Sequence, residues 1–116
     1  METINDKYTK YFGRLNDPTS SAFIKGPCGD EMEFYLVIEN DKIQDIRFYT
    51  TGCEPTIMCA SVVAENTIGK TIYDGLGIFA KEVMDVLQDL PADHKHCSIL
   101  AVTTFYRACA DYLLKS

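Results

Sequence analysis

Alternating hydrophobic and polar positions in the first half of the chain predict a pair of β-strands. In Glu31–Glu39 every second residue from Met32 onward is hydrophobic, and glutamates stand on the opposite face. The segment Ile43–Thr50 repeats the alternation with Ile46 and Phe48, after the polar turn Asn-Asp-Lys. A period of two residues is typical of a strand with one buried face. Two such strands joined by a short polar turn predict an antiparallel hairpin.

Spacings of three and four residues between hydrophobic positions predict helices on both sides of this hairpin. An edge strand over Ser20–Lys25 is expected before the hairpin. The expected helical segments are Ile4–Leu15, Pro55 to about Ile68, a short element at Thr71–Asp74, Phe79–Leu87, and about His94 to Leu114. The last helix carries a hydrophobic stripe of Ala101, Phe105, Ala108 and Tyr112. Because the strands are grouped together in sequence, we predict an α+β fold with a small antiparallel sheet of about three strands and helices packed on one face.

Length and charge narrow the class of protein. The 116 residues predict a single domain over 1–116. The 11 Lys and Arg against 17 Asp and Glu give a net charge of −6, which excludes a protein that follows a nucleic-acid backbone or binds membranes through basic residues. Uncharged stretches are much shorter than the ~20 residues that a membrane span needs. Residues 1–16 are charged throughout, unlike a signal peptide. We therefore expect a cytoplasmic protein with neither nucleic-acid nor membrane partners.

Three of the five cysteines lie at the ends of predicted elements. Cys28 is in a glycine-rich bend before the hairpin, Cys53 is at the start of a helix, and Cys97 is in the first turn of the last helix. A helix N-terminus favours thiolate over thiol, and thiolate is the form that binds metal or attacks sulfur. The odd count and the absence of any C-x-x-C pair predict reduced or metal-bound cysteines rather than disulfides.

Asp30 and His96 extend this group, because Asp30 follows Cys28 by two residues and His96 precedes Cys97. Thiolates with a carboxylate or an imidazole suit Zn²⁺ or iron–sulfur clusters. A single cysteine is more often a small buried hydrophobe, but the shared glycine, proline or polar surroundings favour one common site. The remaining cysteines are assigned to packing, with an approach to the site left open for Cys59 and a core position expected for Cys109.

The motifs that carry these residues resemble those of a known family. Cys28-Gly29-Asp30, Gly52-Cys53 and His96-Cys97-Ser98 resemble the motifs of the U-type iron–sulfur cluster scaffolds, which comprise IscU, SufU and the N-terminal domain of NifU. The resemblance extends from about Lys25 to Tyr112. It includes Lys42–Phe48, Gly69-Lys70-Thr71 and Leu90-Pro91.

The resemblance implies a non-enzymatic scaffold for the transient assembly of a [2Fe–2S] cluster. It implies that Cys28, Cys53 and Cys97 are cluster ligands and sulfur acceptors, with Asp30 as a labile oxygen ligand and His96 as an alternative one. The fourth ligand stays open among Asp30, His96 and Cys59. The implied partners are a cysteine desulfurase, which supplies sulfur, and apo iron–sulfur proteins, which receive the cluster. Whether one chain or a cluster-bridged homo-oligomer holds the cluster is also open.

Two features separate this chain from parts of that family. Residues 90–95 read L-P-A-D-H-K where other scaffolds have L-P-P-V-K, so docking of the dedicated Hsp70-type chaperone is not predicted. A zinc-binding, SufU-like sulfur-transfer protein is the alternative reading. It ranks lower because the 43 residues between Cys53 and Cys97 leave no room for the long insertion of that subgroup. A zinc-stabilised interaction module is a third reading.

Overall fold

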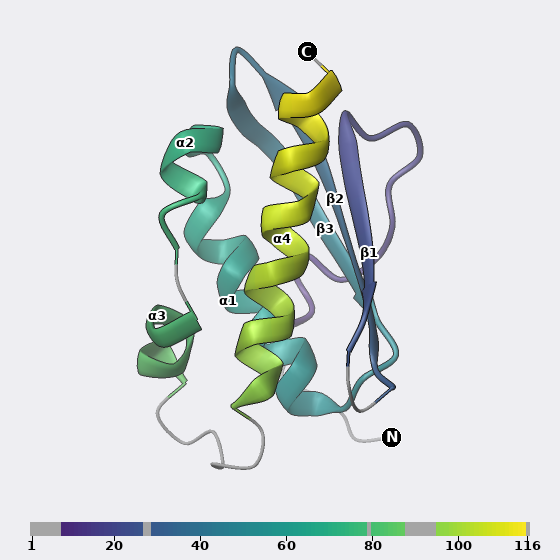
Figure 1. The fold of residues 1–116 in the computed structure, drawn as a ribbon, viewed down its shortest axis with the longest axis vertical. Helices are drawn as coiled ribbons and strands as arrows, with labels where there is room; N and C mark the ends of the chain where they lie inside the picture. The colour runs from purple at the N-terminus through teal and green to yellow at the C-terminus, as the bar shows by residue number, and fades with distance from the viewer. Residues whose placement is uncertain (1–7, 27–28, 79, 88–94, 116) are drawn as a thin grey trace.

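The structure, a computed structural model, describes residues 8–26, 29–78, 80–87 and 95–115 (Figure 1). The elements in chain order are β1 (Ser20–Lys25), β2 (Glu31–Glu39), β3 (Lys42–Thr50), α1 (Glu54–Thr67), α2 (Ile72–Gly75), α3 (Ala80–Val86) and α4 (His96–Lys115). From Ser20 onward every predicted strand and helix is present. β1 and β2 have the predicted bounds, and the bounds of the other elements differ from the prediction by one or two residues.

The strands form one antiparallel sheet in the order β1-β2-β3. Phe34 at the centre of β2 stands opposite Ala22 of β1 and Phe48 of β3. Between β2 and β3, Asn40 and Asp41 have φ values of 54° and 62°. Two consecutive positive φ values are those of a type I′ turn, whose twist matches that of the flanking strands. The predicted hairpin is therefore confirmed. Asn40 and Asp41 adopt the backbone conformation that a two-residue turn needs.

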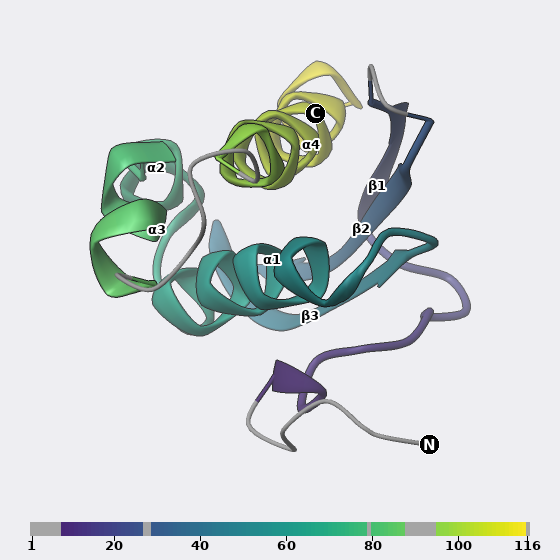
Figure 2. The same cartoon turned by 90° about the horizontal axis from the view of Figure 1, so that it is seen from below.

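Helices α1 and α4 cover one face of the sheet. The short helices α2 and α3 lie together at one side of this helical layer, in contact with it (Figures 1 and 2). The alternating hydrophobic residues of β2 and β3 point toward these helices and are buried. Phe34 joins the two layers, because its ring centroid lies 6.1 Å from Phe48 and 5.9 Å from Phe105 of α4. The α+β class with helices on one face is confirmed. Cys59 and Cys109 are both fully buried in this core, as expected for packing residues.

The prediction of a helix over Ile4–Leu15 is wrong for its described part, because this segment pairs with the free edge of β3. The Gly13 amide donates to the Phe48 carbonyl at 2.7 Å, and the Phe48 amide donates to the Tyr11 carbonyl at 2.9 Å. Gly13 has a φ of 141°, which a helix does not accommodate. An unpaired strand edge needs hydrogen-bond partners, and that need outweighs the local helical spacing of the hydrophobic residues.

None of the helices in the described part of the chain is long and apolar enough to cross a bilayer.

Replacing Phe105 by Ala is expected to lower the free energy of unfolding by about 3–5 kcal/mol, since it removes a fully buried ring between α4 and the sheet. Leu114→Ala on the same helix is the matched control. Its side chain is 86% exposed, so the expected change is within about 0.5 kcal/mol. Denaturant unfolding followed by circular dichroism measures both variants. Equal losses would contradict the role of Phe105 in anchoring α4.

Candidate functional site

Hydrogen bonds at the end of the β2–β3 pair set the position of the site. The Thr50 hydroxyl donates to the Glu31 carbonyl at 2.6 Å and accepts from the Gly52 amide at 3.0 Å. The Glu31 amide donates to the Thr51 hydroxyl at 3.1 Å. These bonds tie the residues entering β2 to the residues leaving β3. Asp30, just before β2, is thereby brought beside the Gly52-Cys53 connection that leads into α1.

Cys53 caps the N-terminus of α1. Its backbone is extended, with φ −79° and ψ −178°, and its carbonyl accepts from the Thr56 amide at 3.0 Å and the Ile57 amide at 3.2 Å. Pro55 fits the first turn, where its missing N–H costs no hydrogen bond. The Cys53 side chain is exposed. The predicted position of Cys53 at the start of a helix is therefore confirmed. Because its thiol is exposed, a partner molecule can reach it.

Cys97 is in the first turn of α4, where it turns inward and is only 1% exposed. The Ser98 hydroxyl donates to the Lys95 carbonyl at 2.7 Å, which completes the turn that starts this helix. The half-buried ring of His96 lies next to the thiol, with 3.8 Å between its Nε2 and the Cys97 sulfur. The N-terminus of α1 thus presents the exposed sulfur of Cys53, and the N-terminus of α4 presents the buried sulfur of Cys97, to the same region.

A residue that the sequence analysis did not single out joins these groups. The hydroxyl of Thr56 lies 3.3 Å from the Cys97 sulfur, 3.3 Å from Oδ2 of Asp30 and 3.8 Å from the Cys53 sulfur. Thr56 is completely buried. The structure therefore brings Asp30, Cys53 and Cys97 together around one side chain. The sequence did offer one signal for Thr56, because this residue follows the predicted ligand Cys53 by three positions, about one helical turn.

Gly52 makes room for Thr56. A Cβ atom on Gly52 would stand 2.8 Å from the Thr56 side chain, closer than real Cβ contacts allow. Its φ lies outside the left-handed range, so the need for glycine here is one of space rather than of backbone conformation. The glycine of the Gly52-Cys53 motif therefore has a packing role that the motif alone does not reveal.

Cys59 forms part of the wall behind these residues. Burial first, and then the neighbouring Cys97 and Cys53, together raise the pKa of its thiol to about 12. Cys109, deeper in the core, also has a pKa raised to about 12 by burial. Both side chains are thus held as neutral thiols. Cys59 lies close enough to the site to interact with it electrostatically while packing in the core, so the two alternatives for this residue are not exclusive.

Some predicted positions lie outside the described residues, namely Cys28 and residues 88–94, which include most of the L-P-A-D-H-K segment. Within the described ranges, no three His, Cys, Asp or Glu side chains are grouped closely enough to hold a metal ion. Asp30, Cys53 and Cys97 meet through Thr56 rather than around a common vacant point. The four described cysteines form no disulfide with one another.

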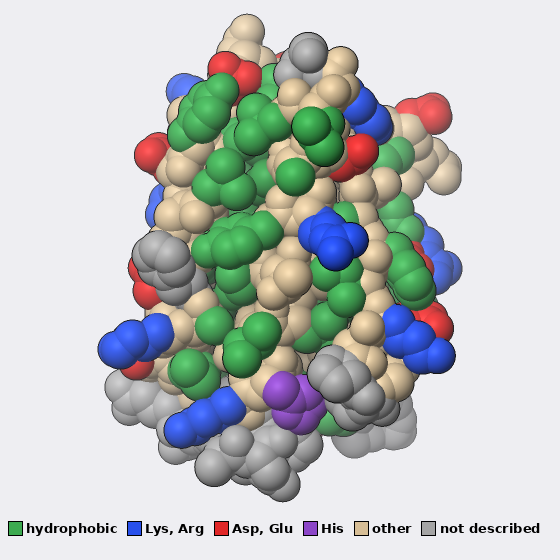
Figure 3. Space-filling view, in the orientation of Figure 1, with side chains coloured by type: hydrophobic (Ala, Val, Ile, Leu, Met, Phe, Trp, Pro, Cys, Tyr) green, Lys and Arg blue, Asp and Glu red, His purple; other side chains and the backbone are tan. Residues whose placement is uncertain are grey.

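A groove of about 300 Å³ borders the site between the end of β1 and the first turns of α4. Its lining includes Ile24, Gly26, His96, Ile99 and Leu100. Ile99 is 57% exposed. In the space-filling view, hydrophobic side chains are spread over the face that α4 presents, with Lys or Arg among them and other charged side chains toward the edges (Figure 3).

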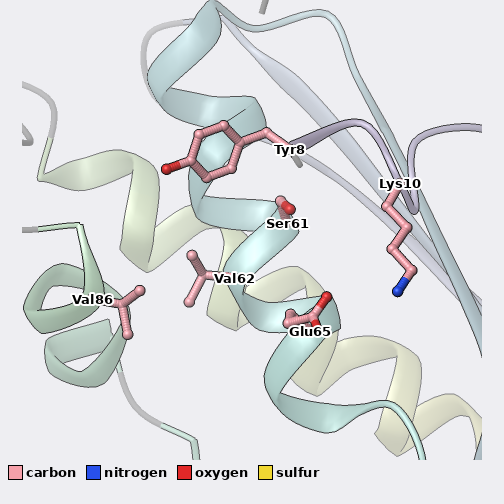
Figure 4. A pocket seen from close by; sticks show the side chains of 6 residues that line it. All are labelled: Tyr8, Lys10, Ser61, Val62, Glu65 and Val86. Carbon is pink, nitrogen blue, oxygen red and sulfur yellow. The ribbon is translucent and has the colours of Figure 1, made fainter. Parts of the chain in front are cut away.

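A second hollow, of about 400 Å³, lies away from these residues along α1 (Figure 4). Tyr8 and Val62 lie on one part of its wall, and Val86 of α3 lies on another. None of the predicted ligands is among the described residues that line it. This hollow is therefore separate from the described thiols.

The fold and the site together define a small α+β domain that presents thiols from helix ends, the chemistry that soft metals and sulfur require. The sequence model of the NifU-like N-terminal domain matches residues 4–116, and the chain belongs to this family. An iron–sulfur cluster assembly scaffold protein IscU of Aquifex aeolicus is 39% identical, over 96% of this chain and 76% of its own length. The scaffold protein IscU 1 of Archaeoglobus fulgidus is 36% identical, over 90% and 69%. The Escherichia coli IscU is 32% identical, over 96% and 88%.

Solved structures support the fold independently of close sequence similarity. A NifU-like N-terminal protein from Brucella abortus has a TM-score of 0.72 at 18% identity, covering 97% of this chain and 95% of its own. A scaffold protein described as putative, for the SUF system of Fervidobacterium islandicum, has a TM-score of 0.71 at 22% identity, covering 90% and 91%. At these identities the similarity establishes the architecture alone. The predicted family and its fold are confirmed.

Gly52→Ala is expected to destabilise the protein by about 1–3 kcal/mol, because the added methyl group overlaps the buried Thr56 side chain. Thermal and denaturant unfolding measure the loss, and NMR chemical shifts of the Thr56 methyl group report its displacement. Unchanged stability together with unchanged Thr56 shifts would contradict the close packing of these two residues.

Proposed function

We propose that this chain is a scaffold on which a [2Fe–2S] cluster is assembled transiently and then passed to apo-proteins. The observation that carries the proposal is the convergence of Asp30, Cys53 and Cys97, from three different elements, around Thr56. Its support is the membership of the NifU-like N-terminal family and the scaffold names of relatives that cover most of the chain. The chain itself carries out no turnover; it receives, holds and releases its cargo.

Among the cysteines that the structure describes, Cys53 is the exposed one, so its thiol is the one of these four that a desulfurase persulfide reaches most readily. The Cys53 thiolate attacks the terminal sulfur of that persulfide, a new S–S bond forms at Cys53, and the desulfurase cysteine leaves as a thiolate. An external electron donor then supplies two electrons for each sulfur that becomes sulfide. Iron completes the cluster, with Cys28, Cys53 and Cys97 as sulfur ligands.

Asp30 fits the role of the labile ligand. A carboxylate is a harder donor than a thiolate and holds the iron of a cluster less firmly. The hydrogen bond from the Thr56 hydroxyl holds its Oδ2 beside the thiols of Cys53 and Cys97. His96, beside Cys97, is the alternative donor. A scaffold has to release what it assembles, so one weak ligand among stronger ones suits this function.

Anaerobic reconstitution with ferrous iron, cysteine and a cysteine desulfurase tests the proposal. The wild type is expected to bind iron and sulfide in equal amounts, with the Mössbauer spectrum of a [2Fe–2S] cluster, and to transfer the cluster to an apo-ferredoxin. Cys28→Ala, Cys53→Ala and Cys97→Ala are each expected to lose most of the bound cluster. Cys109→Ala is the matched control, since this buried thiol lies on the same helix as Cys97 but about 18 Å further along it.

The other outcomes separate the alternatives. Persulfide on a cysteine together with bound zinc, and no cluster, would replace the proposal by zinc-dependent sulfur transfer. Inert zinc with neither persulfide nor cluster would leave a zinc-stabilised interaction module. Equal losses in Cys109→Ala and Cys97→Ala would show that the variants act through folding rather than through ligation.

Asp30→Ala is expected to slow transfer of the assembled cluster to apo-ferredoxin several-fold, because it removes the weakest ligand and with it the easiest route of release. The rate is followed by circular dichroism in the visible region. Asp85→Ala is the control, since Asp85 is an exposed carboxylate of α3 whose ion pair with Lys81 lies at the surface. Transfer as fast as that of the wild type, or faster, would contradict the role of Asp30.

A further inference from the structure

Thr56 lies where the predicted ligands meet, and we propose that it is a positioning residue that holds Asp30 and the cysteine sulfurs in register before the cargo arrives. The proposal rests on the proposed function, which supplies the cargo. It assigns to Thr56 no bond to iron. Its role is to keep three proposed ligand groups, carried by separate elements, directed toward one region.

The hydroxyl has the hydrogen-bonding capacity for this role. A threonine hydroxyl offers one donor and two acceptor lone pairs. Donation to Oδ2 of Asp30, at 3.3 Å, leaves both lone pairs for the thiols of Cys97, at 3.3 Å, and Cys53, at 3.8 Å. One side chain can thus link a carboxylate and two thiols at the same time. The link connects segments that are 26 and 41 residues apart in the chain.

Two other buried threonines show what this side chain does when it has no ligands nearby. The Thr67 hydroxyl donates to the Val63 carbonyl, and the Thr104 hydroxyl donates to the Leu100 carbonyl, each at 2.8 Å. Both bonds return to the carbonyl four residues earlier, which is the usual arrangement inside a helix. Thr56 is in the first turn of α1, and its hydroxyl is directed to side chains instead.

Burial makes the orientation of Thr56 stable. The residue is fully buried and lies against Gly52, where even a methyl group would not fit. A β-branched side chain in a helix has few χ1 rotamers to choose from. Because a buried hydroxyl is costly unless it is hydrogen-bonded, the ligands also hold Thr56 in place. Valine would fill the same volume, so packing alone does not account for a hydroxyl here.

The test compares Thr56→Val, which keeps the shape, with Thr56→Ser, which keeps the hydroxyl. Titration of the metal-free protein with Co²⁺ under anaerobic conditions gives the affinity and the sulfur-to-cobalt charge-transfer band. Thr56→Val is expected to bind Co²⁺ about 10-fold or more weakly, the usual effect of losing a partner that orients a metal ligand. Thr56→Ser is expected to restore most of the affinity. Thr67→Val, the same change at the other end of α1, is the control and should bind Co²⁺ like the wild type.

Unfolding of each variant separates positioning from stability. Equal Co²⁺ affinity and equal charge-transfer spectra in Thr56→Val and the wild type would overturn the proposal, as would equal weakening in Thr67→Val and Thr56→Val. Reconstitution of the wild type judges the proposed function separately. A wild type that assembles no cluster would refute the scaffold function, while the Co²⁺ titration would still decide the role of Thr56.

Discussion

The contact between Phe105 of α4 and Phe34 of β2 fixes the position of the last helix against the sheet. The ring of Phe105 is fully buried, its centroid is 5.9 Å from that of Phe34, and a Cβ on Gly75 of α2 would stand only 3.0 Å from it. A ring enclosed by a sheet and a second helix leaves α4 little freedom to slide along its axis. Because a helix is rigid along its length, fixing Phe105 also fixes Cys97, about 12 Å nearer the N-terminus. The ligand end of α4 is therefore set by the core.

The remaining ligand groups are positioned by elements of similar rigidity. Asp30 directly precedes β2, and Cys53 caps α1, so both inherit their positions from the hydrogen bonds that join Glu31 to Thr50. Groups on helix and strand ends keep a fixed geometry better than groups within long loops. Thr56 then needs to align only side chains, not backbones. This division explains how an acidic chain of modest size holds together the three segments that carry the proposed ligands.

Local patterns predicted most of this architecture because most of it is local. Alternation in β2 and β3 and the helical spacing of Ala101, Phe105 and Ala108 each reflect burial on one side of a single element. The prediction of an N-terminal helix was wrong because the conformation of this segment depends on the edge of β3, which is distant in sequence. Thr56 was missed for the same reason, since its importance lies in contacts with Asp30 and Cys97 rather than in its neighbours. The motifs supplied the candidate ligands through family resemblance, but the contacts that join Asp30, Cys53 and Cys97 became visible only in three dimensions.

The thiols around the site differ in access, and the difference fits an order of events. Cys53 is exposed, Cys97 is buried beside Thr56, and burial raises the pKa of Cys59 to about 12. A neutral thiol is a poor nucleophile, so sulfur delivered from outside is expected at Cys53 rather than at Cys59. Cys97 lies within reach of the same hydroxyl as Cys53, so it can join the cargo without moving through solvent. The fold thereby separates an exposed thiol, at Cys53, from a buried one, at Cys97, as the proposed function requires.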